Sequence, residues 1–220
     1  TPMAGIQMPN GATLEIAAAY GPAIPFTALT NANPAVATAA AHGLAEGDVI
    51  AISSGWTRLE GRGLRVGEIA SGTFALDGVN TTNVQQYPAS SGIGSVREVT
   101  GFTEISQITE LNSTGGEQQF LTFGLLADDD DRQMPTTKNP ITLTFTVADD
   151  PSKPYVAVCE AADDDKQARL LRLNLPGGSS IIYNGYVSIT STPTMSRNNL
   201  MTRVISIALT GRPTRYAATV

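Results

Sequence analysis

The sequence has one cysteine, one histidine and one tryptophan among 220 residues, and each scarcity excludes a class of site. Cys159 has no partner for an intramolecular disulfide, so we expect no disulfide framework and folding in a reducing cytoplasm. One histidine and one cysteine cannot provide the four ligands of a structural zinc ion. The histidine, His42, lies in a turn-like Ala-His-Gly-Leu segment, so no Ser-His-Asp triad is predicted.

Charge and long apolar runs are also scarce. Only 15% of the residues are charged, the net charge is -6 and the sequence pI is about 4.7. An acidic chain releases no condensed counterions from phosphates, which argues against a nucleic-acid-binding protein. No apolar run approaches the roughly 20 residues that a membrane-spanning helix needs, so no membrane partner is predicted.

Motifs for bound phosphates and metals are missing as well. There is no Walker pattern and no GxGxxG after a strand. The acidic run at residues 128–131 lacks the ligand spacing of a calcium loop, and we interpret it and the run at 163–165 as solvated. Paired carboxylates for sugar hydrolysis would meet only in three dimensions, and nothing singles out such a pair. We therefore predict no metal, no cofactor and no enzyme.

Strand patterns are abundant. Residues 141–147 alternate Ile, Leu, Phe and Val with threonines, which is the period-2 pattern of a half-buried strand. Similar alternation predicts strands at residues 171–175, 181–189 and 203–209. One helix is predicted over residues 151–162, with Asp150 as its N-cap and Pro151 in its first position. The apolar face of this helix would consist of Tyr155, Val158, Cys159 and Ala162.

These elements predict a mainly β chain, a β sandwich or open barrel with one α-helix. Residues 1–26 are interpreted as an extended arm and a first strand that Pro22 and Pro25 end. Residues 27–93 are interpreted as an inserted small β module with short strands at 47–52, 64–66 and 73–76, and it closes in a linker at 87–92. Residues 94–220 would complete the main domain, with strands at 96–99 and 104–108 and a long loop at 111–140 that has little to bury.

The end of the chain carries a resemblance. Tyr183-Asn184-Gly185-Tyr186-Val187-Ser188, then Thr202-Arg203, then Gly211-Arg212-Pro213 resemble the end of the lambda-type siphophage major tail tube protein domain. The upstream order of acidic loop, threonine-rich strand, helix and Pro-Gly-Gly turn also agrees. The likeness spans residues 95–215 and the opening strand. Residues 27–93 depart from it, because the family usually has a short connection there.

The resemblance implies a structural subunit in the virion tail, assembled in the host cytoplasm. Such subunits form stacked hexameric rings and give about four strands each to one continuous inner barrel. About 24 strands spaced ~4.8 Å and tilted ~40° give a backbone diameter of roughly 48 Å. The implied partners are further copies of the chain, the tape measure protein and double-stranded DNA in the lumen, and the tail terminator and tail tip proteins.

The strand pattern assigns residues to this architecture. The small polar residues predicted to face the lumen are Thr142, Thr144, Thr146, Thr202, Ser206 and Thr210. The residues predicted to contact the next ring are Asp128, Asp129, Asp130, Asp131, Arg132, Gln133 and Met134. The arm before Asn10 is a second candidate for that contact.

Two other functions remain open on the sequence. Another ring-forming tail part, a terminator or a baseplate hub protein, would share much of the fold. An adhesin or carbohydrate-binding β module would share the composition, but it predicts clustered surface aromatics. Trp56 is the only tryptophan and the six tyrosines are dispersed.

Overall fold

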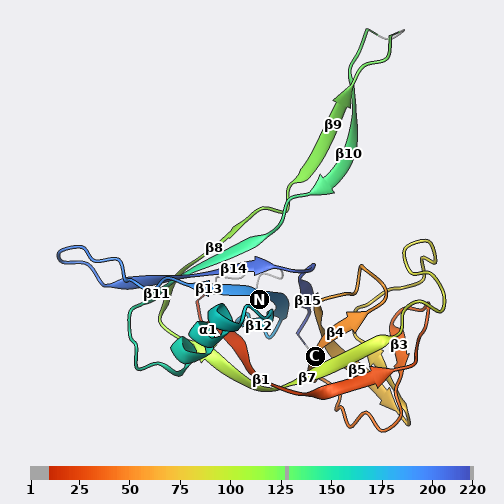
Figure 1. The fold of residues 1–220 in the computed structure, drawn as a ribbon, viewed down its shortest axis with the longest axis horizontal. Coiled ribbons are helices and arrows are strands. Elements are labelled where there is room, and N and C mark those ends of the chain that lie inside the picture. Colours follow the sequence, from red (N-terminus) through yellow and green to blue (C-terminus); the bar gives the residue numbers. More distant parts are fainter. Residues whose placement is uncertain (1–9, 127–128, 219–220) are drawn as a thin grey trace, which may run out of the picture.

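The computed structural model describes residues 10–126 and 129–218 (Figure 1). These residues form a 13-stranded antiparallel sheet, a separate two-stranded hairpin and one α-helix. The mainly β fold with one helix is thus confirmed. The elements are β1 Thr13–Phe26, β2 Ala28–Leu29, β3 Ala35–Thr38, β4 Val49–Ser54, β5 Arg62–Ala70, β6 Thr73–Leu76, β7 Gly94–Ile105, β8 Ile108–Thr114, β9 Gln118–Phe123, β10 Arg132–Lys138, β11 Thr142–Ala148, α1 Pro154–Asp165, β12 Arg169–Asn174, β13 Ser180–Ile189, β14 Thr202–Leu209 and β15 Thr214–Tyr216.

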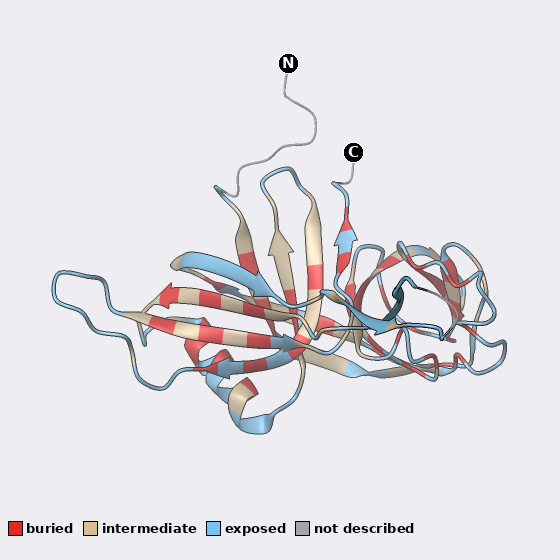
Figure 2. Ribbon diagram, turned by 90° about the horizontal axis from the view of Figure 1, so that it is seen from above, coloured by how far each residue is buried: buried red, intermediate tan, exposed pale blue. Residues whose placement is uncertain are grey.

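The sheet order is β2-β3-β6-β5-β4-β7-β1-β12-β13-β14-β11-β8, with β15 beside β13. The strands from β1 to β8 in this order, with α1 on one face, form what we call the main half. Its core lies between the sheet and α1 and includes Phe145, Ile205 and Ile207, all fully buried. Buried and partly exposed residues alternate along its strands, as the bands in Figure 2 show. The predicted strand at 141–147 is confirmed as β11.

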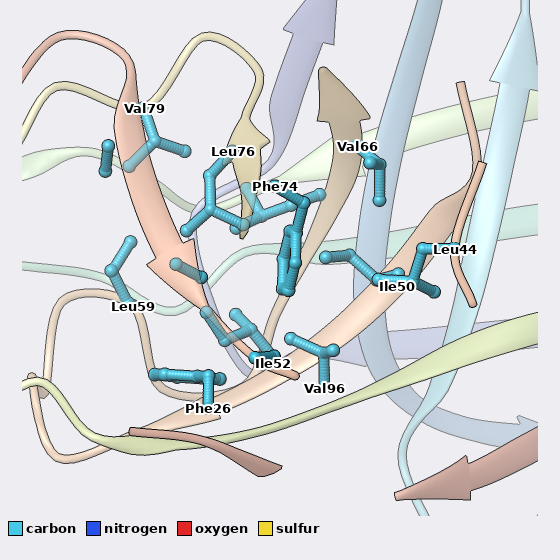
Figure 3. Packing of buried hydrophobic residues seen from close by; sticks show 14 of the residues in the cluster. Phe26, Leu44, Ile50, Ile52, Leu59, Val66, Phe74, Leu76, Val79 and Val96 are labelled. Atoms are coloured by element: carbon cyan, nitrogen blue, oxygen red, sulfur yellow. The ribbon is translucent and has the colours of Figure 1, made fainter. Parts of the chain in front are cut away.

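The other half, which we call the module, has its own core. Strands β2 to β6 and the adjoining ends of β1 and β7 surround sixteen buried residues that run from Phe26 to Val96 (Figure 3). Within the module the strand order is β2-β3-β6-β5-β4-β7-β1. Because β2 follows β1 after one residue, this part of the order begins and ends on the same run of chain. The sequence predicted strands at 47–52, 64–66 and 73–76, and β4, β5 and β6 lie there.

The module is joined to the main half by two long strands. β1 and β7 continue from one half into the other and pair with each other from Leu14↔Ile105 to Phe26↔Gly94. A third cluster of buried residues, including Ala17, Val49 and Leu170, fills the junction. A Cβ on Gly63 of β5 would lie 2.4 Å from Leu170 Cδ2, so the two halves are in close contact.

The predicted linker at 87–92 is wrong. Tyr87 is buried and its ring meets that of Trp56 edge-on, with centroids 5.2 Å apart. The Trp56 indole N–H donates to Pro88 O at 2.8 Å. The segment packs on the module because it covers the tryptophan, which a sequence rich in Pro, Ser and Gly does not reveal.

Proline does not end the first strand, contrary to our prediction. β1 continues through Pro22 and Pro25 to Phe26. Its register with β7 shifts between Tyr20 and Ala23, and on its other side β12 pairs only with residues 13–16. Proline lacks an N–H, and an irregular or one-sided stretch of strand needs no donor there.

The predicted start of the helix was three residues early. α1 begins at Pro154, its N-cap is Lys153, and no side chain caps it. Asp150 instead accepts hydrogen bonds from the N–H and hydroxyl of Ser152, which makes a turn before the helix. Of the predicted apolar face, Tyr155, Cys159 and Ala162 are buried and Val158 packs against the same core; Val156 is buried as well.

Two further boundaries differ from the predictions. β7 is one strand through residues 94–105, and the chain turns at Gln107, whose φ is 60°, before β8 starts. The predicted loop at 111–140 instead contains the end of β8 and the hairpin β9–β10, which projects from the sheet (Figure 1). Its own ladder holds it together, and no apolar alternation marks it because neither face packs on the main half.

Candidate assembly surfaces

Four neighbouring strands, β8, β11, β14 and β13, form what we call the ribbon. Register places residues side by side across it: Thr114, Thr142, Ala208 and Tyr186 form one row, and Asn112, Thr144, Ser206 and Ser188 form the next. These side chains lie on the face opposite α1, because the residues between them belong to the buried core. We call this the polar face; its residues on the four strands are Glu110, Asn112, Thr114, Thr142, Thr144, Thr146, Thr202, Val204, Ser206, Ala208, Tyr186 and Ser188.

Five of the six residues predicted to face a lumen share this face. Thr210 is the exception, since it follows the end of β14 and its hydroxyl donates to Asn184 O at 3.1 Å and Gly61 O at 3.2 Å. The residues of β8 were missed. The only local signal was Leu111 between Glu110 and Asn112, because the rest of residues 109–114 is polar.

No strand within the described ranges 10–126 and 129–218 pairs with the outer edge of β8, which ends the sheet. The Leu209 N–H donates to Ile141 O at 3.0 Å. The backbone groups of odd-numbered residues along β11 therefore point toward β14. Even-numbered residues of β11 therefore bond to β8, and the N–H groups of Leu111 and Ser113 point outward. An exposed strand edge of this kind can pair with another chain.

The other edge of the ribbon is β13 beyond its contact with β12, which covers only residues 180–185. There Asp163, near the end of α1, accepts from the Ile189 N–H at 3.2 Å. One carboxylate of the acidic run at 163–165 thus caps a strand edge. Another, Asp165, pairs with Arg169.

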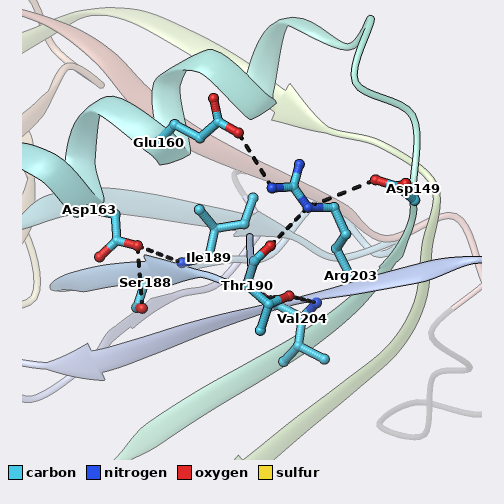
Figure 4. A network of polar contacts seen from close by, with 8 residues as sticks. All are labelled: Asp149, Glu160, Asp163, Ser188, Ile189, Thr190, Arg203 and Val204. Carbon is cyan, nitrogen blue, oxygen red and sulfur yellow. Dashed lines mark hydrogen bonds and ion pairs between the residues drawn. The ribbon is translucent and has the colours of Figure 1, made fainter. Parts of the chain in front are cut away.

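Beneath α1, Arg203 anchors the ribbon (Figure 4). Its side chain is 10% exposed, and its Nε donates to Thr190 O at 2.9 Å and lies 3.8 Å from Asp149 Oδ1. Its Nη2 lies 3.4 Å from Glu160 Oε1 on the helix. A buried guanidinium needs such partners. Through them this arginine of the Thr-Arg motif connects β14 to α1 and to the loop that precedes α1.

The hairpin β9–β10 exposes apolar side chains on both of its faces. Leu121 pairs with Met134 on one face, and Phe120 pairs with Pro135 on the other. Phe120, Leu121 and Met134 are each more than half exposed. Large exposed apolar groups on a projecting element are typical of an interaction surface.

The six predicted inter-ring residues that the structure describes fall on this hairpin or its tip. Arg132, Gln133 and Met134 begin β10 and pair with Phe123, Thr122 and Leu121. Asp129, Asp130 and Asp131 are exposed in the connection before it. Asp128 lies outside the described residues, as does the arm before Asn10.

Arginines gather where the module meets the end of β14. Arg58, Arg62 and Arg212 line a hollow of about 360 Å³ together with Glu60, and we call this the arginine pocket. Burial lowers the pKa of Arg62, and Arg212 acts in the same direction. A neighbouring hollow of about 620 Å³ includes Lys138 at the base of the hairpin.

Comparison with known proteins identifies the family of the chain. Residues 54–218, three quarters of the chain, match the sequence profile of the phage tail tube proteins. The chain belongs to the phage tail tube protein family. The resemblance seen in the sequence is confirmed, and the matched part includes the ribbon, the hairpin and the C-terminal Gly-Arg-Pro.

Tail tube proteins are structural components of the virion tail, and this chain is one of them. The match begins inside the module, at residue 54. A solved structure described as the virion of a native gene transfer agent particle is also similar, at 11% identity and a TM-score of 0.40. The alignment covers 53% of this chain and 89% of that one. A search of curated proteins finds no match.

Three features that would indicate another kind of site are absent from the described residues of this tail tube family member. Across residues 10–126 and 129–218, no group of three or more His, Cys, Asp and Glu is placed to hold a metal ion. No helix in those ranges is long and apolar enough to cross a membrane. Trp56, which a sugar-binding surface would expose, is only 2% exposed.

Proposed function

We propose that the protein assembles into closed, stacked rings, six subunits to a ring, that form the conduit for DNA in a phage tail. The observation that carries this proposal is the ribbon, which has one face packed against its own helix, one polar face and an unpaired edge at β8. Neighbouring copies that joined their ribbons would remove the free edges and place the polar faces on the inside.

Four strands from each of six subunits give the ~24 strands and the roughly 48 Å backbone diameter expected for such a barrel. The ribbon supplies the four strands of one subunit, β8, β11, β14 and β13. After subtraction of the side chains, the lumen would be ~40 Å wide at most, which admits duplex DNA or an extended tape measure protein.

The chemistry of the polar face suits a channel through which DNA slides. The polar face carries threonine and serine hydroxyls, one carboxylate at Glu110, and no lysine or arginine. Phosphates are held mainly by cations, so this surface would leave DNA mobile. On this account Thr142, Thr144, Thr146, Thr202 and Ser206 face the lumen, and Thr210 lies at its rim.

Contacts between rings would use the hairpin, whose two apolar faces have no partner on the main half. The arm before Asn10 is the second candidate. The module, interpreted as an insertion at residues 27–93, would lie on the outer surface, where extra mass is tolerated. The tail terminator and the tail tip proteins would contact the two ends of the tube.

Negative-stain electron microscopy of the purified protein over a range of concentrations tests the proposal. We expect rings at low concentration and long hollow tubes at high concentration. Single rings that never stack would favour a tail terminator or hub protein instead. A particle that stays monomeric at every concentration would overturn the proposal.

A further inference from the structure

The arginine pocket has more cations than its own chain neutralises. Arg58 and Arg212 form no hydrogen bond or ion pair with any described residue, and both are exposed. Arg62 donates through Nη2 to Thr214 Oγ1 at 2.8 Å, but its Nε is buried and has no partner. A buried donor without a partner among the described residues is costly, so the guanidinium of Arg62 is only partly satisfied by its own chain.

The carboxylate in the pocket does not fill this need. Glu60 accepts from the Ser54 N–H at 2.6 Å and from the Ser53 hydroxyl at 3.2 Å. Three guanidinium groups therefore face one carboxylate that is already engaged. Planar guanidinium groups bind carboxylates in pairs of parallel hydrogen bonds, so the pocket is suited to an acidic segment.

The tip of the hairpin is such a segment. Asp129, Asp130 and Asp131 are exposed, and no ion pair joins them to a described cation. The exposed Leu125 and Leu126 come just before this run. Three adjacent carboxylates repel one another in isolation, so a cationic receptor would stabilise this tip.

The tip cannot reach the pocket of its own chain. The base of the hairpin, at Gln118 and Lys138, borders the hollow next to the pocket. Asp131 lies seven residues along β10 from Lys138, which is about 23 Å at ~3.3 Å per residue. The hairpin points away from the module (Figure 1), so only another copy can bring a tip to the pocket.

We propose that the arginine pocket is the receptor for the acidic hairpin tip of a second copy of this chain. This inference rests on the proposed tube assembly and adds to it the receptor for the hairpin. A protrusion and a receptor at different places on one subunit make a head-to-tail contact, which generates rings or open polymers rather than a two-fold dimer. Stacked rings would use it as an open polymer. Because the arginine pocket lies where the module meets the end of β14, the module would then take part in the contact between stacked rings.

Charge reversal tests the pairing. The pocket variant Arg58→Glu/Arg212→Glu and the tip variant Asp129→Arg/Asp130→Arg should each raise the protein concentration needed for tubes at least about tenfold. The chain carrying all four substitutions should recover tubes, because the charges then match again. Lys153→Glu/Lys166→Glu, at the two ends of α1, changes the net charge as much as the pocket variant and should leave assembly unchanged.

Circular dichroism melting of each variant separates misfolding from lost assembly. The chain with all four substitutions is a further control, because it assembles only if every substitution is compatible with folding. If the wild-type protein forms tubes and the pocket variant assembles equally well, the arginine pocket is not the receptor, and the tube proposal stands. Loss of assembly in both charge variants without recovery in the combined chain would also overturn it. Absence of tubes in the wild type would instead reject the proposed function.

Discussion

At the scale of residues, the family motif Tyr183-Asn184-Gly185-Tyr186 has a steric reason. A Cβ on Gly185 would lie 2.6 Å from Ala208 O and 2.7 Å from Ile207 Cγ2. Glycine therefore allows β13 to approach β14 where the ribbon starts. This glycine was part of the resemblance, but the close approach that requires it is visible only in the structure.

Gly185→Ala should destabilise the subunit by about 1–3 kcal/mol, because the added methyl forces the two strands apart. Urea unfolding of the monomer measures the change. Gly101→Ala in β7 is the matched control, since its Cβ would meet only Ala19 Cβ, at 3.7 Å. Equal stability of the two variants would contradict this explanation of the motif.

Cys159 is a buried apolar residue rather than a reactive one, as its place on the helix predicted. Burial raises the pKa of its thiol to about 12, from an ordinary value near 9. The folded state then holds this proton more tightly than the unfolded state does between those two pH values. The contribution to stability is complete below pH 9 and is lost as the pH rises toward 12.

We therefore expect the unfolding free energy to fall from pH 9 to pH 11, by at most about 1.4 kcal/mol per pH unit for this one group. Cys159→Ala should show a shallower slope over the same range, whatever its absolute stability. Urea unfolding at several pH values measures both slopes. Tyr216, whose pKa burial raises to about 12, adds a slope that the variant retains. Identical slopes would rule out a buried, protonated thiol.

At the scale of elements, the sequence was most informative where one face of a strand is buried. β11 and β14 were predicted because apolar and polar residues alternate strictly along them. The hairpin β9–β10 was missed for the same physical reason, since an element with no buried face carries no such alternation. The helix start was misplaced because Asp150 forms a turn with Ser152, while a second proline, Pro154, begins the helix.

The edge of β8 gives an element-scale prediction. Ser113→Pro removes an N–H that points outward and leaves the ladder to β11 intact, so the monomer should remain folded. Rings should not close, because the proline blocks pairing with a neighbouring ribbon. Ser113→Ala retains the N–H and should assemble like the wild type. Analytical ultracentrifugation compares the two, and ring formation by the proline variant would show that this edge is not the subunit contact.

Deletion of residues 124–137 gives a second prediction at the scale of elements. The hairpin contributes nothing to the buried clusters, so the shortened chain should keep nearly the same melting temperature. It should remain a soluble particle that does not stack, because the contact between rings has been removed. Light scattering at high protein concentration follows stacking, and unimpaired tubes would exclude the hairpin from that contact.

At the scale of the whole molecule, the sequence indicated a mainly β chain of a tail tube family, with a module between its first two long strands. It could not show that β1 and β7 run through both halves, because their pairing joins residues 68 to 91 positions apart, from Phe26↔Gly94 to Leu14↔Ile105. Nor could it show the arginine pocket, which brings together residues near 60 and near 212. Such surfaces depend on packing between distant segments, and no local pattern encodes them.

The central claim is that the polar face of the ribbon becomes the wall of a channel when copies join. A cryo-electron microscopy reconstruction of tubes grown from the purified protein tests this most directly. We expect a continuous inner barrel with Thr142, Thr144 and Thr146 toward the lumen and α1 outside. A channel lined by α1, or a tube in which the ribbons of neighbouring subunits do not pair, would contradict it.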